Sequence, residues 1–180
     1  MPKIDHQLDI AIEGLDRQFI AGTWTKVASK LEPVISPSTE QVLAHTAMPT
    51  LADADEAAKL AKKAYDDGPW TRLSIQERVQ YCTRLCDAME SRMAELNRAW
   101  VMESGPTLSH AQLINDNVAT AIWRKMLNMA PDLPWEEQRE DALLLREPVG
   151  TVLAIMTFNG PIVLMAMKII PALLAGCTVI

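Results

Sequence analysis

The chain has 180 residues, 49% of them hydrophobic and 22% charged, with a formal net charge of -6 at pH 7. This composition is that of a folding protein, the length suffices for one ordinary domain, and the lack of any Lys/Arg cluster argues against a nucleic-acid partner. Three cysteines without a paired framework, and a charged N-terminus without an apolar signal core, predict a cytoplasmic protein.

The pattern of residues 17–47 predicts short strands. In "RQFIAGTWTK" a turn at Gly22 separates two apolar pairs, and in "EPVISPSTEQVLAHTA" a Ser-Pro-Ser-Thr-Glu turn separates two β-branched runs. We expect a small antiparallel meander here.

Capping patterns predict where the first two helices begin. Asp53 with Glu56 forms a capping-box pattern ahead of "AAKLAKKAYDD", and Gly68-Pro69 ends that helix. Ser74 with Glu77 repeats the pattern ahead of the second helix.

Apolar residues at three- and four-residue steps predict one long amphipathic helix from Ile75 to Trp100, ended by Gly105-Pro106. Cys82 and Cys86 lie on its apolar stripe, where a small apolar role is expected rather than a redox or metal-binding one. A third helix is predicted near 109–128, with three apolar residues on one side: Leu113, Ile122 and Met126.

Residues 131–148 break the helical pattern. Two prolines, an acidic run and a short apolar patch in "PDLPWEEQREDALLLR" predict an exposed connector or a hairpin arm. An arm that projects from its domain suits a contact with another subunit.

Residues 149–180 have the pattern of a strand, a helix and a second strand. The run 149–155 is too short for a typical helix and rich in β-branched residues, which predicts a strand buried on both faces. Pro161 fits the first position of a helix, Gly176 fits the position after its end, and 177–180 begins another strand. A crossover of this kind implies parallel strands.

A membrane span is the alternative for this region, since 149–167 is uncharged and close to the ~20 residues that cross a bilayer. Gly150, Asn159, Gly160 and Pro161 would, however, place irregular backbone in the hydrocarbon, where each unsatisfied group costs several kcal/mol. We therefore expect an incomplete doubly wound α/β domain whose sheet edge and apolar helix face are exposed, because the chain supplies no further strands to cover them.

Several segments together resemble the N-terminal part of the NAD(P)-dependent aldehyde dehydrogenase superfamily. They are "FIAGTW", "ISPSTEQVLA", "ADADEAAKLAKKAYDDGPWTRLSIQERVQYCTRL", "ESG", "REPVGTVLAIMTFNGP" and "MKIIPALLAGCTVI", in the family's order and separations. The resemblance implies an α/β fold divided into three parts. These are the N-terminal part of the cofactor-binding domain (1–130), an oligomerisation arm (131–148) and the first βαβ unit of a Rossmann-like sheet (149–180).

The resemblance also implies an activity: oxidation of an aldehyde to a carboxylic acid with NAD or NADP, through a cysteine thioester that a glutamate-activated water hydrolyses. Neither the nucleophile nor the glutamate matches a residue here, so we expect the 180 residues alone to be inactive. The resemblance further implies a homo-oligomer, dimer or tetramer. A truncated subunit that binds full-length partners and, less favoured, a membrane-anchored protein are the alternatives.

Two residues match catalytic positions of the family. Asn159 matches the asparagine whose amide points at the aldehyde oxygen, where it stabilises negative charge as that charge develops; the alternative is an Asn that caps the helix after it. Lys168, the lone charge on an apolar helix, matches a lysine that assists proton movement. The alternative is a lysine that reaches the surface or pairs with a carboxylate.

Other matched positions surround the cofactor and the substrate. The resemblance implies cofactor contacts, largely through backbone, at Ile155, Met156, Thr157 and Phe158, although the family usually has Pro and Trp at the last two. It implies a substrate tunnel lined by Gly160, Val163, Leu164 and Met167, and the lack of large aromatic residues there predicts a bulky or flexible apolar aldehyde. Three scattered histidines without metal-ligand spacing predict no metal site.

Overall fold

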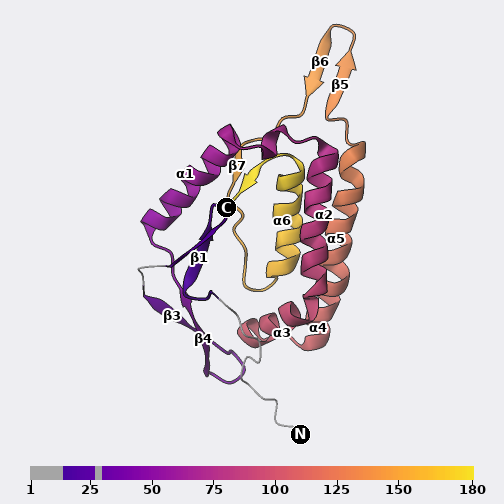
Figure 1. Ribbon diagram of the computed structural model, residues 1–180. Helices are drawn as coiled ribbons and strands as arrows, with labels where there is room; N and C mark the ends of the chain where they lie inside the picture. The colour runs from indigo at the N-terminus through magenta and orange to yellow at the C-terminus, as the bar shows by residue number, and fades with distance from the viewer. Residues whose placement is uncertain (1–13, 27–29) are drawn as a thin grey trace.

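The structure is a computed structural model that describes residues 14–26 and 30–180. Its helices are, in chain order, α1 (Leu51–Asp67), η1 (Trp70–Arg72), α2 (Ile75–Ser91), α3 (Met93–Ser104), α4 (Leu108–Gln112), η2 (Leu113–Ala119), α5 (Thr120–Met129), η3 (Ala130–Asp132) and α6 (Pro161–Leu174). Its strands are β1 (Arg17–Ile20), β2 (Thr23–Lys26), β3 (Leu31–Ile35), β4 (Val42–Ala47), β5 (Glu136–Arg139), β6 (Ala142–Leu145), β7 (Thr151–Val152) and β8 (Thr178–Val179). Figure 1 shows their arrangement.

The N-terminal strands form two antiparallel hairpins, β1–β2 and β3–β4, in separate two-stranded sheets. The expected strands and turns are confirmed, but the single meander is wrong, because β2 does not pair with β3. Instead the amide of Ala47 donates to the carbonyl of Leu15 at 2.7 Å, which links the end of β4 to the start of β1. Turn residues predict which two strands form each hairpin, but they do not predict how one hairpin pairs with another.

The N-cap of the first helix lies three residues before the predicted one. Thr50 is the N-cap of α1, and its hydroxyl accepts a hydrogen bond from the amide of Asp53, whose carboxylate accepts in turn from the amide of Thr50. Asp53 is therefore the third residue of the helix (N3) and closes the capping box, whereas Thr50 is the N-cap. The box of Ser74 and Glu77 at the start of α2 is confirmed.

The predicted long helix is two helices. Arg92, with φ -111° and ψ 14°, interrupts the helical backbone between α2 and α3. The apolar spacing runs across this break because both helices contribute to the same core, so the spacing alone could not reveal it. Gly105 ends α3 in the left-handed conformation (φ 81°), as predicted.

The third predicted helix is present as α4, η2 and α5. The residues buried there recur every fourth position: Ala111, Asn115, Ala119, Trp123 and Leu127. Of the three apolar residues predicted on one side, Leu113 is 55% exposed, whereas Ile122 and Met126 pack against the core. The stretch η2 is a π-helix, whose wider turn favours this four-residue repeat.

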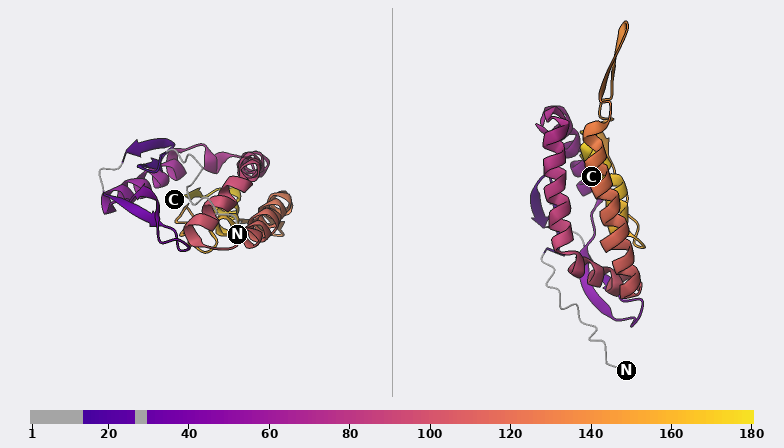
Figure 2. Two further views of the ribbon diagram at one scale, coloured as in Figure 1. Left: turned by 90° about the horizontal axis from the view of Figure 1, so that it is seen from below. Right: turned by 90° about the vertical axis from the view of Figure 1, so that its right-hand side faces the viewer.

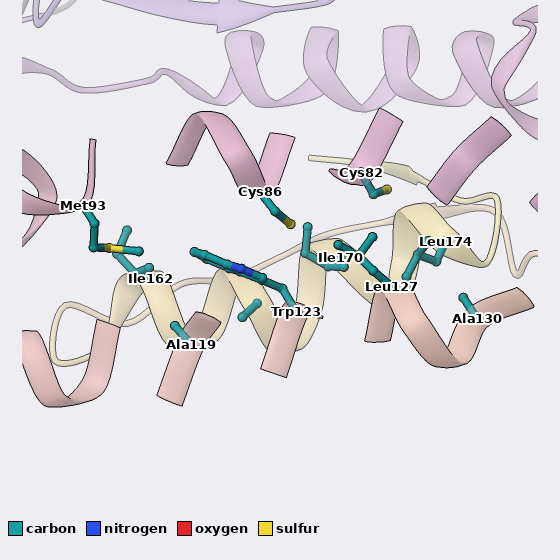
Figure 3. Close-up of a cluster of buried hydrophobic side chains, with 11 residues drawn as sticks. Cys82, Cys86, Met93, Ala119, Trp123, Leu127, Ala130, Ile162, Ile170 and Leu174 are labelled. Carbon is teal, nitrogen blue, oxygen red and sulfur yellow. The ribbon is translucent and has the colours of Figure 1, made fainter. Parts of the chain in front are cut away.

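The core lies among α2, α5 and α6, which contact one another. Figure 3 shows the ring of Trp123 in the middle of a cluster that includes Cys82 and Cys86, so their apolar role is confirmed. The indole Nε1 of Trp123 donates to Glu90 Oε1 at 2.6 Å, which satisfies the one polar atom of this buried ring.

The C-terminal residues form the predicted parallel βαβ unit. β7 pairs with β8, Thr151 opposite Thr178, and α6 connects them. Figure 1 shows α1 and α6 on opposite sides of this strand pair. The Thr178 hydroxyl lies 2.9 Å from that of Thr151 and donates to the carbonyl of Ala61 in α1 at 3.0 Å.

The first strand of this unit is shorter and more exposed than predicted. Only two residues are extended in β7, and the flanking Val149, Leu153 and Ile155 are 88%, 65% and 65% exposed. The prediction of a strand buried on both faces is therefore wrong for this chain; among the described residues, β7 pairs with β8 alone. Within the described ranges, no helix is long and apolar enough to cross a membrane.

Residues 131–148 contain the predicted hairpin. Figures 1 and 2 show β5 and β6 projecting away from the helices as a two-stranded ribbon. At its base, Trp135 Nε1 donates to the carbonyl of Ala130 at 2.7 Å, and Arg146 donates to the carbonyl of Pro134. A contact of this arm with another subunit stays a prediction.

Candidate functional site

The candidate site is the loop 153–160, which connects β7 to α6. Figure 1 shows this loop running along α6 to the end of the helix that lies nearest α3. The indole Nε1 of Trp100 and the hydroxyl of Ser104, both in α3, donate to the carbonyl oxygen of Phe158, each at 3.0 Å. Two donors on one carbonyl fix the backbone immediately before Asn159.

Lys168 holds the other end of the loop. Its Nζ donates to the carbonyl oxygen of Ile155 at 2.6 Å, in an exposed contact, and it forms no ion pair with a carboxylate in the part of the chain that the structure describes. This contact ties the loop to the second half of α6. A role of Lys168 in moving protons stays a prediction.

The side chain of Asn159 is exposed at the tip of this loop and does not cap α6. The N-cap is Gly160, and no side chain bonds the first turn of the helix, so the capping alternative is wrong: Asn159 lies one position outside the helix. Its Oδ1 accepts a hydrogen bond from Thr157 Oγ1 at 2.6 Å. Nδ2 has no acceptor in the part of the chain that the structure describes.

The predicted cofactor residues lie at the carboxyl end of β7, where ligands of parallel sheets bind. Ile155 and Phe158 are 65% and 80% exposed, Thr157 is exposed and Met156 is half-buried. This surface is open to a ligand, although the carbonyl of Ile155 and that of Phe158 are already engaged by the protein.

The predicted tunnel residues share one side of α6 but differ in surroundings. Gly160 is buried, Leu164 is half-buried and Met167 is 53% exposed. Val163 packs against the core, and a Cβ at position 160 would lie 3.1 Å from its Cγ1. Glycine at 160 thus makes room for the side chain of Val163.

Sequence reasoning missed Trp100 and Ser104. Trp100 appeared there only as an apolar member of a helical stripe, and Ser104 only as part of the "ESG" segment, with no role assigned to it. Each contacts a residue more than fifty positions away, and no local pattern reveals such a pairing.

The three thiols of the chain are all buried, with exposed fractions of 2% or less for Cys82, Cys86 and Cys177. Burial raises the pKa of Cys82 and of Cys86 to about 11. Because a nucleophilic cysteine must be an accessible thiolate, none of the three fits that role.

A hollow of about 770 Å³ lies away from this loop, between the β1–β2 hairpin, α1 and β8. Its lining is largely apolar and contains none of the predicted site residues. Among the residues that the structure describes, no three His, Cys, Asp or Glu side chains gather in a way that could hold a metal ion.

Comparison with known proteins decides the family. The family model described as "Aldehyde dehydrogenase family" matches residues 24–180. The chain belongs to the aldehyde dehydrogenase family. Aldehyde dehydrogenase 1 from Tanacetum cinerariifolium is 33% identical over 167 residues, which are 90% of this chain and 34% of that protein. Geranial dehydrogenase from Castellaniella defragrans is 30% identical over 168 residues, 90% of this chain and 35% of that protein.

Solved aldehyde dehydrogenases share the fold, which confirms the predicted α/β class. The enzyme from Mycobacterium tuberculosis, complexed with NAD+, superposes with a TM-score of 0.86 at 30% identity and covers 91% of this chain. A mutant of aldehyde dehydrogenase C from Pseudomonas syringae, complexed with NAD+ and octanal, has a TM-score of 0.81 at 28% identity. This chain corresponds to 35% and 34% of those two structures, and so spans about a third of its relatives' length.

Proposed function

We propose that this chain supplies the cofactor-facing loop and the oxyanion donor of an NAD(P)-dependent aldehyde dehydrogenase, which oxidises an aldehyde to a carboxylic acid. The observation that carries the proposal is Asn159: a side-chain amide with an unengaged Nδ2, at the tip of a loop held by α3 and α6. A donor held in place before the reaction stabilises the charge that develops on the aldehyde oxygen.

We propose NAD or NADP as the cofactor, contacted by Ile155, Met156, Thr157 and Phe158. Their exposure at the carboxyl end of β7 fits a ligand there, and related structures are complexed with NAD+. When bound, the cofactor accepts the hydride that leaves the substrate. The residues of this chain shape the surface beside it and orient the aldehyde oxygen.

The attacking thiolate comes from outside these 180 residues, since the three thiols here are buried. As the thiolate adds to the aldehyde carbon, the carbonyl oxygen gains negative charge, and Nδ2 of Asn159 donates to it. We expect the 180 residues alone to show no aldehyde oxidation, and measurable turnover by the purified chain would contradict this.

We propose a bulky or flexible apolar aldehyde as the substrate. Gly160 and Met167 lie where the tunnel is expected, and neither residue is aromatic; Leu164 adds apolar surface between them. The descriptions of two relatives name apolar aldehydes: one is a geranial dehydrogenase, and the other is an aldehyde dehydrogenase complexed with octanal.

We propose that the β5–β6 arm joins subunits into a homo-oligomer, a dimer or a tetramer. Three consecutive leucines on β6, Leu143, Leu144 and Leu145, are 54%, 41% and 48% exposed, which is unfavourable unless a partner covers them. The same surface would let a truncated subunit join full-length ones. A cytosolic aldehyde dehydrogenase of Mus musculus, 31% identical, supports a cytoplasmic location.

The test of this function replaces Asn159 in a complete aldehyde dehydrogenase that contains these 180 residues. Asn159→Ala should lower kcat by about 10²–10³, the effect of losing one oxyanion donor, with little change in KM. Asn128→Ala, at an exposed asparagine of α5 far along the chain, is the matched control and should leave kcat unchanged. An unaltered kcat in Asn159→Ala would refute the proposal.

A further inference from the structure

We propose that Thr157 is a positioning residue whose hydroxyl holds the side-chain amide of Asn159 with Nδ2 turned outward. The inference rests on the proposed function of Asn159 and adds the group that sets its orientation. The contact that carries it is the hydrogen bond from Thr157 Oγ1 to Asn159 Oδ1, at 2.6 Å.

An asparagine amide needs such a contact to have a defined orientation. Its terminal torsion is broad and nearly two-fold, so without a partner the oxygen and the nitrogen exchange places at little cost. The amide is planar, with an acceptor oxygen on one side and a donor nitrogen on the other. A hydroxyl that donates to Oδ1 therefore fixes where Nδ2 lies as well.

The backbone around this pair is held, so the two side chains keep their separation. Between them lies Phe158, whose carbonyl accepts from Trp100 and Ser104 in α3. Two residues before Thr157, the carbonyl of Ile155 accepts from Lys168 in α6. The backbone is thus tethered before the Thr157–Asn159 pair, at Ile155, and within it, at Phe158. The hydrogen bond between the two side chains then sets the direction of the amide.

Two effects on catalysis follow from this arrangement. First, the amide has a set orientation before an aldehyde arrives, so no reorientation is needed as charge develops on the substrate oxygen. Second, a hydrogen bond to Oδ1 polarises the amide and makes its N–H groups better donors. Both effects act on the reaction step rather than on substrate binding.

The first experiment compares three threonine variants in a complete aldehyde dehydrogenase that contains these 180 residues. Thr157→Val removes the hydroxyl at nearly constant shape and should lower kcat by about five- to tenfold, the size expected for one neutral hydrogen bond, with KM changed less than about twofold. Thr157→Ser retains the hydroxyl and should restore kcat. Thr25→Val removes an exposed, hydrogen-bonded hydroxyl far from the loop and should have no effect.

A double variant separates this inference from the function on which it rests. If Thr157 acts through Asn159, then Thr157→Val should cause no further loss of kcat in an Asn159→Ala background. An unchanged kcat in Asn159→Ala would overturn the proposed function itself. A large loss in Asn159→Ala, with none in Thr157→Val, would overturn the positioning role alone, as would equal losses in Thr157→Val and Thr157→Ser.

A second experiment needs no activity and uses the 180-residue chain labelled with 15N. The side-chain amide resonances of Asn159 report the bond to Oδ1 directly. They should shift in Thr157→Val, stay near their original positions in Thr157→Ser and be unaffected by Thr25→Val. Resonances of Asn159 that do not move in Thr157→Val would overturn the inference, because the hydroxyl would then make no bond to the amide.

Discussion

The indole Nε1 of Trp100 donates a hydrogen bond to the carbonyl oxygen of Phe158 at 3.0 Å, across 58 positions of the chain. Trp100 is buried, with 3% of its surface exposed, whereas Phe158 is 80% exposed. A rigid residue of the helical core thus fixes one peptide group of an open loop. This contact fixes the backbone immediately before Asn159, whose own side chain is exposed.

The first prediction concerns this link. Trp100→Phe keeps an aromatic ring but removes the donor, and Ser104→Ala removes the second donor to the same carbonyl. Each should lower the free energy of unfolding by about 1 kcal/mol, and the double variant should speed amide hydrogen exchange at 156–160. Trp24→Phe, at a tryptophan that is 56% exposed, is the control. Unchanged exchange in the double variant would contradict the link.

The second prediction concerns the thiols. Because burial raises the pKa of Cys82 and of Cys86 to about 11 and covers both side chains, the folded chain should not react with an aromatic disulfide reagent at pH 8. All three thiols should react once denaturant is added. Fast reaction of one thiol in the folded chain would show that the helical core opens readily.

The third prediction compares two glycines of similar backbone conformation. Gly176 has φ 92° and Gly22 has φ 80°, so a side chain at either is strained by about 1–2 kcal/mol. A Cβ at 176 would also lie 2.7 Å from Arg78 Nη1, whereas a Cβ at 22 would meet nothing within 4 Å. Gly176→Ala should therefore destabilise the protein more than Gly22→Ala, as urea denaturation would measure. Equal losses would mean that Arg78 moves aside without cost.

The fourth prediction concerns pH. Hydrogen bonds from Arg124, and to a lesser extent from Trp123, hold the pKa of Glu90 below its usual range. A lowered pKa in the folded state adds stability above the unfolded pKa of about 4.3, and this stability is lost as the pH falls through the folded value.

Glu90→Gln should therefore lower the free energy of unfolding at pH 7 by about 1–2 kcal/mol. The difference from wild type should shrink as the pH approaches 3. Denaturation at several pH values would measure it, with Glu136→Gln, at an exposed residue of the arm, as the control. A difference that is constant with pH would exclude the ion pair as its origin.

Local signals in the sequence predicted the ends of several elements. These signals depend only on residues close by in the sequence, and the structure confirms them at Ser74 with Glu77, Gly105, Pro161 and Gly176. The break between α2 and α3 at Arg92 was not predicted, because the apolar spacing continues through it. Leu113 was predicted on the same side as Ile122 and Met126, but it is exposed while they pack against the core, because a π-helical stretch between them changes the helical repeat.

The site was predictable only in part. Resemblance placed Asn159, and the alternative of a helix cap could be rejected only from the backbone of Gly160. The contacts that support Asn159 come from α3 and α6, and their pairing with the loop depends on how the helices pack. A contact between Thr157 and Asn159 could be expected from the sequence, since the two residues are two positions apart. The residue types did not show which atom of the Asn159 amide the Thr157 hydroxyl would bond.

Helix α1 buries none of its residues fully, in contrast to α2, α5 and α6. Its ties to the remainder of the molecule include two hydrogen bonds, from Thr178 to the carbonyl of Ala61 and from the hydroxyl of Tyr65 to the carbonyl of Pro148. Sub-global opening should therefore begin with this helix: on mild heating it would detach from the strand pair while the three-helix assembly stayed intact, and the molecule would melt in two stages rather than one.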